Sequence, residues 1–228
     1  MNERSNNTEA VKFSSTQLST ESPSPDAVEQ LCLICNELDS LDLLAPYEAP
    51  APIGSNGNLS YRKGDTSRFI VTATRLDTKR DLQPDAFVDV DRYELYGPEE
   101  MDSTAYFHGQ QRPSSESILH WYFYQLYAEI NAIIHVHENT ELLYSKESRS
   151  VWEELGIIET NRYGDAGTVD LPRTVDEVLT NLNEYVVLKD HYPEWDTKHT
   201  GTVVFAENLD RARDRIIQVH EGLSEANR

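Results

Sequence analysis

The feature that most constrains this chain is a long helical pattern followed at once by a short β-branched run. Apolar residues recur at three- and four-residue spacing over 114–130, which predicts an amphipathic helix there. The next segment, 132–137, reads Ala-Ile-Ile-His-Val-His and is typical of a buried strand. The sequence therefore predicts a helix and a buried strand in direct succession.

The rest of the chain alternates between helical and strand-like patterns in the same way. A hairpin is expected around Lys63-Gly64-Asp65, and a turn-rich stretch covers 163–168. We expect from this alternation a layered α/β domain with a mixed sheet. Further helices are predicted over 25–38, 140–155, 175–188 and 209–221, and strands over 58–62, 68–74, 87–95 and 200–205.

Length and local composition predict one domain with a loose tail. A chain of 228 residues suits a single domain and can bury a sizeable core. Residues 1–25 are rich in Ser, Thr, Asn and Pro and poor in apolar residues, so we expect a disordered tail there. The domain itself is expected over residues 26–228.

The charge and the apolar runs exclude several classes of partner. The formal net charge is −20, and such an acidic surface repels nucleic acids and anionic membranes. No apolar run approaches the roughly 20 residues that cross a bilayer. Residues 1–26 lack a basic start followed by an apolar stretch, so they do not resemble a secretory signal. We therefore expect a cytoplasmic protein that binds neither nucleic acid nor membrane.

The sharpest chemical signal is the pair His135 and His137 at the end of the predicted buried strand. Side chains alternate across a strand, so both imidazoles point to the same face. Two adjacent imidazoles at the end of a buried strand form half of a metal site. Two polar residues that merely end a strand remain the alternative.

Three polar residues begin the helix predicted over 114–130. Glu116 in its first turn is a candidate carboxylate for the site, although it also complements the charge of a helix start. Ser114 and Ser115 offer hydroxyls and free backbone N–H groups, which together suit an anion. Ordinary helix capping is the alternative for both serines.

Two histidines compete for the third place in a metal site. His199 directly precedes the strand predicted over 200–205, and a third imidazole there would complete a three-histidine site. His191 is its rival, because it follows Val186-Val187-Leu188 and is also a plausible histidine at the end of a strand. The pattern alone leaves both candidates open.

Taken together, these motifs resemble the class II aldolase/adducin family over roughly residues 27–222. Each motif is weak alone, but five of them in order are fairly specific. The five are Gly57-Asn58-Leu59-Ser60, Phe69-Ile70-Val71-Thr72-Ala73-Thr74, Pro113-Ser114-Ser115-Glu116, His135-Val136-His137, and His199 ahead of a valine-rich strand.

The resemblance implies a three-layer domain in which a mixed, largely antiparallel sheet lies between helices. It implies a divalent metal, zinc by expectation, and Glu116 as the acid/base carboxylate. It also implies a homotetramer with active sites at subunit contacts. The implied metal ligands are His135, His137 and His199, and the implied residues around a substrate phosphate are Asn58, Thr74, Ser114 and Ser115.

The resemblance further implies a metal-dependent aldolase, an aldehyde-lyase of carbohydrate metabolism. Such an enzyme cleaves a sugar phosphate or related hydroxy-carbonyl compound through a metal-stabilised enediolate. Tyr163 is the candidate for the tyrosine that aldolases of this family use as a proton donor. The alternatives are a sugar-phosphate epimerase or dehydratase of the same family, or a non-catalytic, adducin-like interaction module.

The sequence departs from the family pattern at two places near the expected site. Arg75 stands where the family commonly has a glycine after the threonine that matches Thr74. Thr200 intervenes between His199 and Gly201, where the family commonly has glycine directly after the third histidine. The second departure keeps His191 in consideration as the third ligand.

Overall fold

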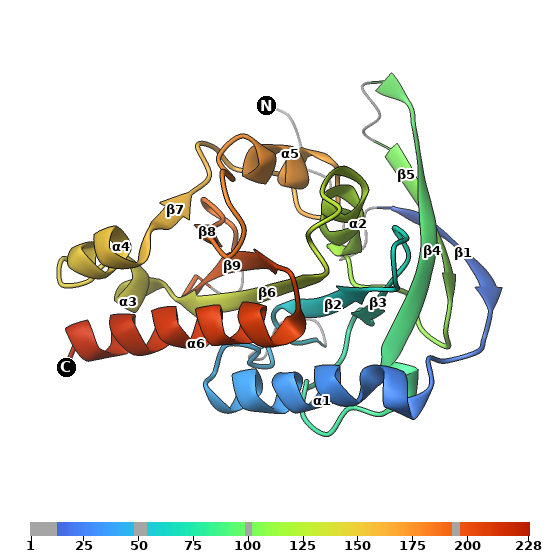
Figure 1. The fold of residues 1–228 in the computed structure, drawn as a ribbon, viewed down its shortest axis with the longest axis horizontal. Helices are drawn as coiled ribbons and strands as arrows, with labels where there is room; N and C mark the ends of the chain where they lie inside the picture. The colour runs from blue at the N-terminus through green and yellow to red at the C-terminus, as the bar shows by residue number, and fades with distance from the viewer. Residues whose placement is uncertain (1–12, 48–53, 99–101, 193–196) are drawn as a thin grey trace, which may run out of the picture.

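The fold is one mixed sheet with helices on both faces (Figure 1). In the computed structural model, which describes residues 13–47, 54–98, 102–192 and 197–228, nine strands are ordered β1-β5-β4-β3-β2-β6-β9-β8-β7. The strands are β1 Ser14–Ser19, β2 Asn58–Arg62, β3 Phe69–Thr72, β4 Phe87–Tyr96, β5 Asp102–His108, β6 Ala132–Asn139, β7 Ile157–Glu159, β8 Tyr185–Val187 and β9 His199–Ala206. The helices are α1 Pro25–Ser40, α2 Ser117–Leu126, α3 Thr140–Tyr144, α4 Arg149–Leu155, α5 Asp170–Asp176, α6 Leu209–Ala226 and the 3-10 turn η1 Pro84–Ala86.

The pairing confirms a mixed, largely antiparallel sheet. Only the two edge pairs, β1 with β5 and β7 with β8, are parallel, and the remaining neighbours are antiparallel. The hairpin predicted around Lys63-Gly64-Asp65 is present as β2 and β3, with Tyr61 opposite Ile70. The buried strand predicted over 132–137 is β6, which lies between β2 and β9. This position puts the histidine pair near the middle of the sheet.

Helices cover the two faces of the sheet unequally (Figure 1). The helices α1 and α6 pack on one face, where α6 contacts β6 and β9. The helices α2 and α5 pack together on the other face. This arrangement is the predicted three-layer α/β domain. Among the helices of the described ranges, none is both long and apolar enough to cross a membrane.

The helix predicted over 175–188 is wrong for most of its length. The helix in this region is α5, Asp170–Asp176, and the segment Tyr185–Val187 forms strand β8. All three residues of β8 are buried, because the strand pairs with β9 on one side and β7 on the other. Strand β8 is the element that leads, through a short turn, to His191.

Two other predicted helices differ in their bounds. The helix expected over 140–155 is broken into α3 and α4, because the Ser148 hydroxyl donates to the Leu142 carbonyl oxygen at 2.6 Å and ends the first helix. The helix expected over 114–130 is shorter and begins at Ser117. The residues before it, 114–116, are therefore free to contribute to a site rather than to the helix.

Part of the predicted disordered tail is ordered. Residues 14–19 form β1, which pairs in parallel with β5, so the expectation of disorder is wrong there. Just before it, Phe13 is buried against Tyr93, with ring centroids 5.5 Å apart. The polar side chains of β1 give no apolar pattern by which the strand could be recognised in the sequence. Such a strand can still form, because an edge strand is held mainly through its backbone. Residues 1–12 of the expected tail lie outside the described residues, and 20–24 connect β1 to α1.

Candidate metal centre

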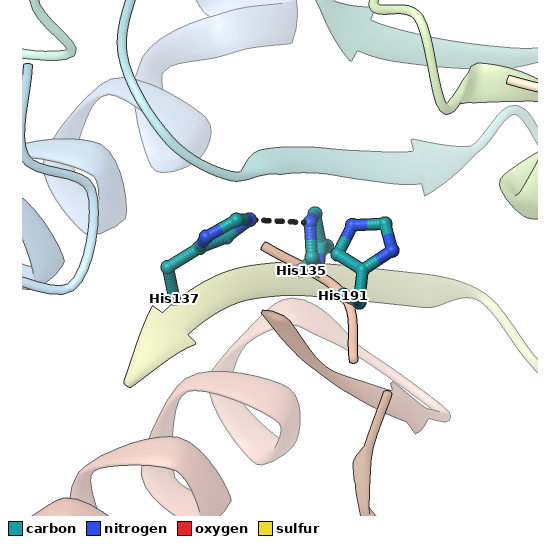
Figure 2. Close-up of side chains that lie close together, drawn as sticks. All are labelled: His135, His137 and His191. Atoms are coloured by element: carbon teal, nitrogen blue, oxygen red, sulfur yellow. Dashed lines mark hydrogen bonds between the residues drawn. The ribbon is translucent and has the colours of Figure 1, made fainter. Parts of the chain in front are cut away.

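Three buried histidines converge on one face of β6 (Figure 2). His135 and His137 point to the same face of the strand, as the alternation predicts, and His191 reaches them from the loop after β8. One ring nitrogen of each histidine lies within 4.8 Å of the others. In the described part of the chain, this is the only group of three or more metal-ligating side chains gathered so closely.

The third member of the group is His191 rather than the predicted His199. The turn after β8 returns His191 to the sheet, where its carbonyl oxygen accepts from the Gly201 N–H at 2.8 Å. His199 begins β9 opposite Asn139, and its Nε2 lies 3.9 Å from Asp42 Oδ2, so it is not a member of the group, although its charge still acts on His137. The sequence favours His199 because it directly precedes a predicted strand, whereas His191 is brought to the group by the turn after β8.

Gly201 makes room for this arrangement. It lies opposite His137 in the β6–β9 register. A Cβ atom there would overlap His191 Cδ2 and would lie 3.0 Å from His135 Cε1. Any side chain at this position would therefore displace the imidazoles, so the close approach of two rings requires glycine.

Glu116 joins the group from the segment just before α2. Its Oε2 lies 2.8 Å from His135 Nε2, and its Oε1 lies 2.8 Å from His191 Nε2. The Asn58 amide donates to Oε2 at 3.1 Å. Burial raises the pKa of Glu116, but the imidazoles of His135 and His191 outweigh it and hold that pKa well below its usual range.

The donor set fits a bound cation. The Thr202 carbonyl oxygen lies 2.8 Å from His135 Nδ1, and since a carbonyl only accepts, Nδ1 carries a hydrogen and the ring is held with Nε2 directed at the site. That Nε2 faces the Glu116 carboxylate and also His137 Nε2 at 3.2 Å. Two imidazole nitrogens on one tetrahedral zinc are about 3.3 Å apart. Three buried imidazoles that converge with a carboxylate therefore form a donor set that could hold a cation.

The imidazole of His137 also suits a metal. Burial, and then the nearby His135 and His191, lower the pKa of His137 well below its usual value. A neutral imidazole is the form that binds a metal. Its Nδ1 is buried and has no hydrogen-bond partner among the described residues.

The predicted anion-binding residues gather near Glu116. The end of β3 lies beside the segment before α2, because the Thr74 N–H donates to the Arg112 carbonyl at 3.0 Å and the Ser114 N–H to the Thr72 carbonyl at 3.2 Å. Both N–H groups are thereby used within the protein. The hydroxyl groups of Thr74, Ser114 and Ser115, rather than these N–H groups, are what the site offers an anion.

Tyr163 lies farther out. Its side chain is 47% exposed, and its hydroxyl donates to Asp165 Oδ1 at 3.3 Å. Burial, then the carboxylate of Asp165, raises the pKa of Tyr163, and the charge of Glu116 adds to this. The charge of Glu116 therefore acts on Tyr163, although Tyr163 makes no hydrogen bond to Glu116.

Comparison with known proteins gives one consistent result. Residues 51–225 match the family model described as the Class II Aldolase and Adducin N-terminal domain. An L-fuculose phosphate aldolase of Methanocaldococcus jannaschii is 25% identical over 173 residues, which are 72% of this chain and 80% of the relative.

Solved structures share the fold. An L-fuculose 1-phosphate aldolase superimposes with a TM-score of 0.59 and 20% identity, over 90% of this chain and 86% of the other. A sugar-phosphate aldolase from Thermotoga maritima gives 0.60 and 16% identity, over 89% and 94%. At these identities the likeness establishes the fold, and it confirms the predicted architecture.

Proposed function

This chain belongs to the class II aldolase and adducin N-terminal domain family, and we propose that it is a metal-dependent aldolase. The proposed reaction cleaves a carbon–carbon bond in a sugar phosphate or a related hydroxy-carbonyl compound. One observation carries the proposal: three buried imidazoles and the Glu116 carboxylate converge on one point. Burying these four polar side chains together costs free energy unless a ligand compensates for it. The cluster therefore argues for catalysis and against a purely structural interaction module.

The histidines are proposed to hold a divalent metal, for which zinc suits imidazole ligands well. When bound, the metal would act as a Lewis acid toward the substrate oxygens. The Thr202 carbonyl fixes the ring of His135 so that Nε2 faces the site. The Asn58 amide and His135 hold one oxygen of Glu116, and the other oxygen meets His191.

Two side chains are proposed to move protons. Cleavage removes the proton from the hydroxyl that becomes the aldehyde, breaks the carbon–carbon bond, and adds a proton at the carbon that keeps the electron pair. Glu116 is proposed to exchange the proton at that carbon, because it is buried and ionised beside the metal ligands. Tyr163 is proposed to exchange the proton at the aldehyde oxygen, and its raised pKa keeps it protonated. These states fit the bond-forming direction, in which ionised Glu116 takes the proton from carbon and Tyr163 gives one to the oxygen; cleavage runs both transfers backwards.

A phosphate group is proposed to bind beside Glu116. Asn58, Thr74, Ser114 and Ser115 supply an amide and three hydroxyls at the meeting point of β2, β3 and the segment before α2. Local donors are needed here, because the net charge of −20 repels anions. Ser114 is buried, so a bound phosphate would lose most of its water and depend on these groups.

We also propose a homotetramer in the cytoplasm, as expected from the family resemblance. An exposed tyrosine such as Tyr163 would become more buried if a neighbouring subunit closed the site. Light scattering on the purified protein tests the assembly, and a mass of one chain, 26.1 kDa, would contradict it.

The test of the proposed function is elemental analysis beside an activity screen. We expect about one zinc or other divalent ion per chain in the wild type and none in His135→Ala. The metal-loaded protein is then assayed against a panel of ketose and aldose phosphates for release of an aldehyde. Epimerised or dehydrated products would assign the chain to another activity of its family. A protein without metal, even after reconstitution, would contradict the proposal and favour an interaction module.

A further inference from the structure

A buried lysine lies close to the metal centre without touching it. Lys79, in the loop between β3 and η1, is 2% exposed. Its ammonium group donates to Ser55 Oγ at 2.8 Å, to the Asn56 carbonyl at 3.0 Å and to the Ser55 carbonyl at 3.3 Å. All three N–H bonds of the ammonium group are thus used on two consecutive residues. Lys79 therefore holds the turn that begins at Ser55.

That turn rests on the strand that carries two of the metal ligands. Gly57 has a φ of 69°, in the left-handed region. A Cβ atom on Gly57 would lie 2.5 Å from the His135 carbonyl oxygen and 3.2 Å from Val136 Cα. Only glycine lets the backbone approach β6 so closely. The turn and the metal strand are therefore packed directly against each other.

The turn ends at the residue that holds the catalytic carboxylate. Asn58 starts β2 opposite His135 and donates to Glu116 Oε2. Its Oδ1 is buried with no partner among the described residues, so the amide is not locked by a second hydrogen bond. The orientation of Asn58 then depends on the backbone just before it, which is the segment that Lys79 clamps.

We infer that Lys79 is a positioning residue for the proposed aldolase, which sets the Asn58 amide, and through it Glu116, by clamping the Ser55–Asn58 turn. The inference rests on the proposed function for its catalytic readout, but the clamp itself is a property of the fold. Lys79 does not react, because its three hydrogen bonds and its burial keep substrate away from the amine.

The surroundings of Lys79 make the clamp sensitive to pH. Burial lowers the pKa of Lys79 to about 8, while the nearby groups Cys35, Asp39 and Glu116 oppose this shift. As the pH rises through this value, the amine loses its charge and one of its three N–H donors. The hold on Ser55 and Asn56 should weaken over that range, while an exposed lysine would still be charged.

The first experiment separates positioning from general stability by a double-mutant cycle. Lys79→Met keeps the length of the side chain and removes the charge, and exposed Lys146→Met is the matched control. With full metal content, we expect kcat to fall about tenfold or more in Lys79→Met and to be unchanged in the control. In an Asn58→Ala background, Lys79→Met should lower kcat less than about twofold further. Equal losses in both backgrounds would overturn the inference.

The second experiment does not depend on catalysis. Amide hydrogen exchange over residues 55–59, corrected for the intrinsic effect of pH, measures the clamp directly. We expect protection in the wild type to fall as the pH rises through about 8, and Lys79→Met to be unprotected already at pH 7. If Lys79→Met fails to fold, Ser55→Ala removes one acceptor and should show a smaller loss of the same kind. Undiminished protection would overturn the inference, whereas lost protection in a protein without aldolase activity would contradict only the proposed function.

Discussion

Strand β6 carries a buried carboxylate–histidine contact on each of its two faces, and the two contacts differ in one respect. On the face toward α6, Glu138 Oε1 accepts from the Asn139 N–H at 2.8 Å, and Oε2 lies 3.0 Å from His220 Nδ1. Each oxygen has its donor, and the pair is complete. On the opposite face, Glu116 meets His135 and His191 at 2.8 Å each, and His137 crowds the same point.

The comparison shows that a buried histidine–carboxylate pair is not by itself a functional site. The Glu138–His220 contact ties β6 to α6 and leaves nothing unsatisfied. The group around Glu116 instead gathers three imidazoles with one carboxylate, and the Nδ1 of His137 has no partner among the described residues. The convergence of several metal-ligating side chains, rather than burial or a single histidine, is what indicates a candidate cation site.

The largest expected difference is in metal affinity, between substitutions at the proposed ligand His191 and at His199. We expect His191→Ala to lower the affinity for a divalent metal by more than about 100-fold, because losing even a group that only supports a ligand costs 10- to 100-fold. His199→Ala, at the start of β9, is the matched control and should keep its metal. Isothermal titration of both metal-free variants with Zn²⁺ measures this. Metal loss in His199→Ala with retention in His191→Ala would reverse the ligand assignment.

Substitution of the two carboxylates, Glu116 and Glu138, should separate an effect on turnover from an effect on stability. We expect Glu116→Gln to keep its metal and lose about 10²- to 10⁴-fold in kcat, because a proton-transfer group is removed. Glu138→Gln should change kcat less than a few-fold but lower the free energy of unfolding by about 1–3 kcal/mol, since it weakens a buried, charge-assisted hydrogen bond. Steady-state kinetics and urea unfolding on both variants measure these effects. Full turnover in Glu116→Gln would remove that residue from the mechanism.

The alternation of β6 explains why half of the site is readable in the sequence. His135 and His137 lie two residues apart on a strand with a clear β-branched pattern, so local physics places both rings on one face. The helix α1 and the hairpin β2–β3 are predicted for the same reason, because each has a periodic pattern and a local connection. These predictions require no knowledge of contacts between residues that are distant in the chain.

The third histidine of the group, His191, is different, because its place depends on long-range pairing. Strand β8 has three residues, too few to show an alternation of period two, and it follows apolar residues at helical spacing. Its identity as a strand comes from pairing with β9 and β7. Lys79 is likewise invisible in the sequence, since its polar loop gives no sign that the fold buries it.

A smaller loss of metal affinity is expected from a substitution at Gly201, which packs against the imidazoles of His191 and His135. Gly201→Ala places a methyl group against His191 and His135, so we expect metal affinity to fall about 10- to 100-fold, as for lost support of a ligand. Gly222→Ala on α6 is the control, because its methyl group would meet only the side chains of Val151 and Leu155, at 3.1 and 3.4 Å. Competition with a chromogenic chelator measures both affinities. Equal affinities in the two variants would mean that the rings can shift without cost.

The smallest expected effect is a pH dependence on the α6 face. The hydrogen bond with Glu138 raises the pKa of His220, and burial only partly opposes this. A raised pKa means that the contact stabilises the protein fully below the ordinary histidine value of about 6.5, and that this contribution is lost as the pH rises through the higher folded value. His220→Gln keeps a donor but does not titrate, so the stability difference between wild type and variant should fall by about 1 kcal/mol between pH 5.5 and pH 9. Urea unfolding at the two pH values gives that difference, and other titrating groups cancel in it. A stability difference that stays constant with pH would mean that His220 is neutral in the folded protein. The Glu138–His220 contact would then be an ordinary hydrogen bond rather than an ion pair.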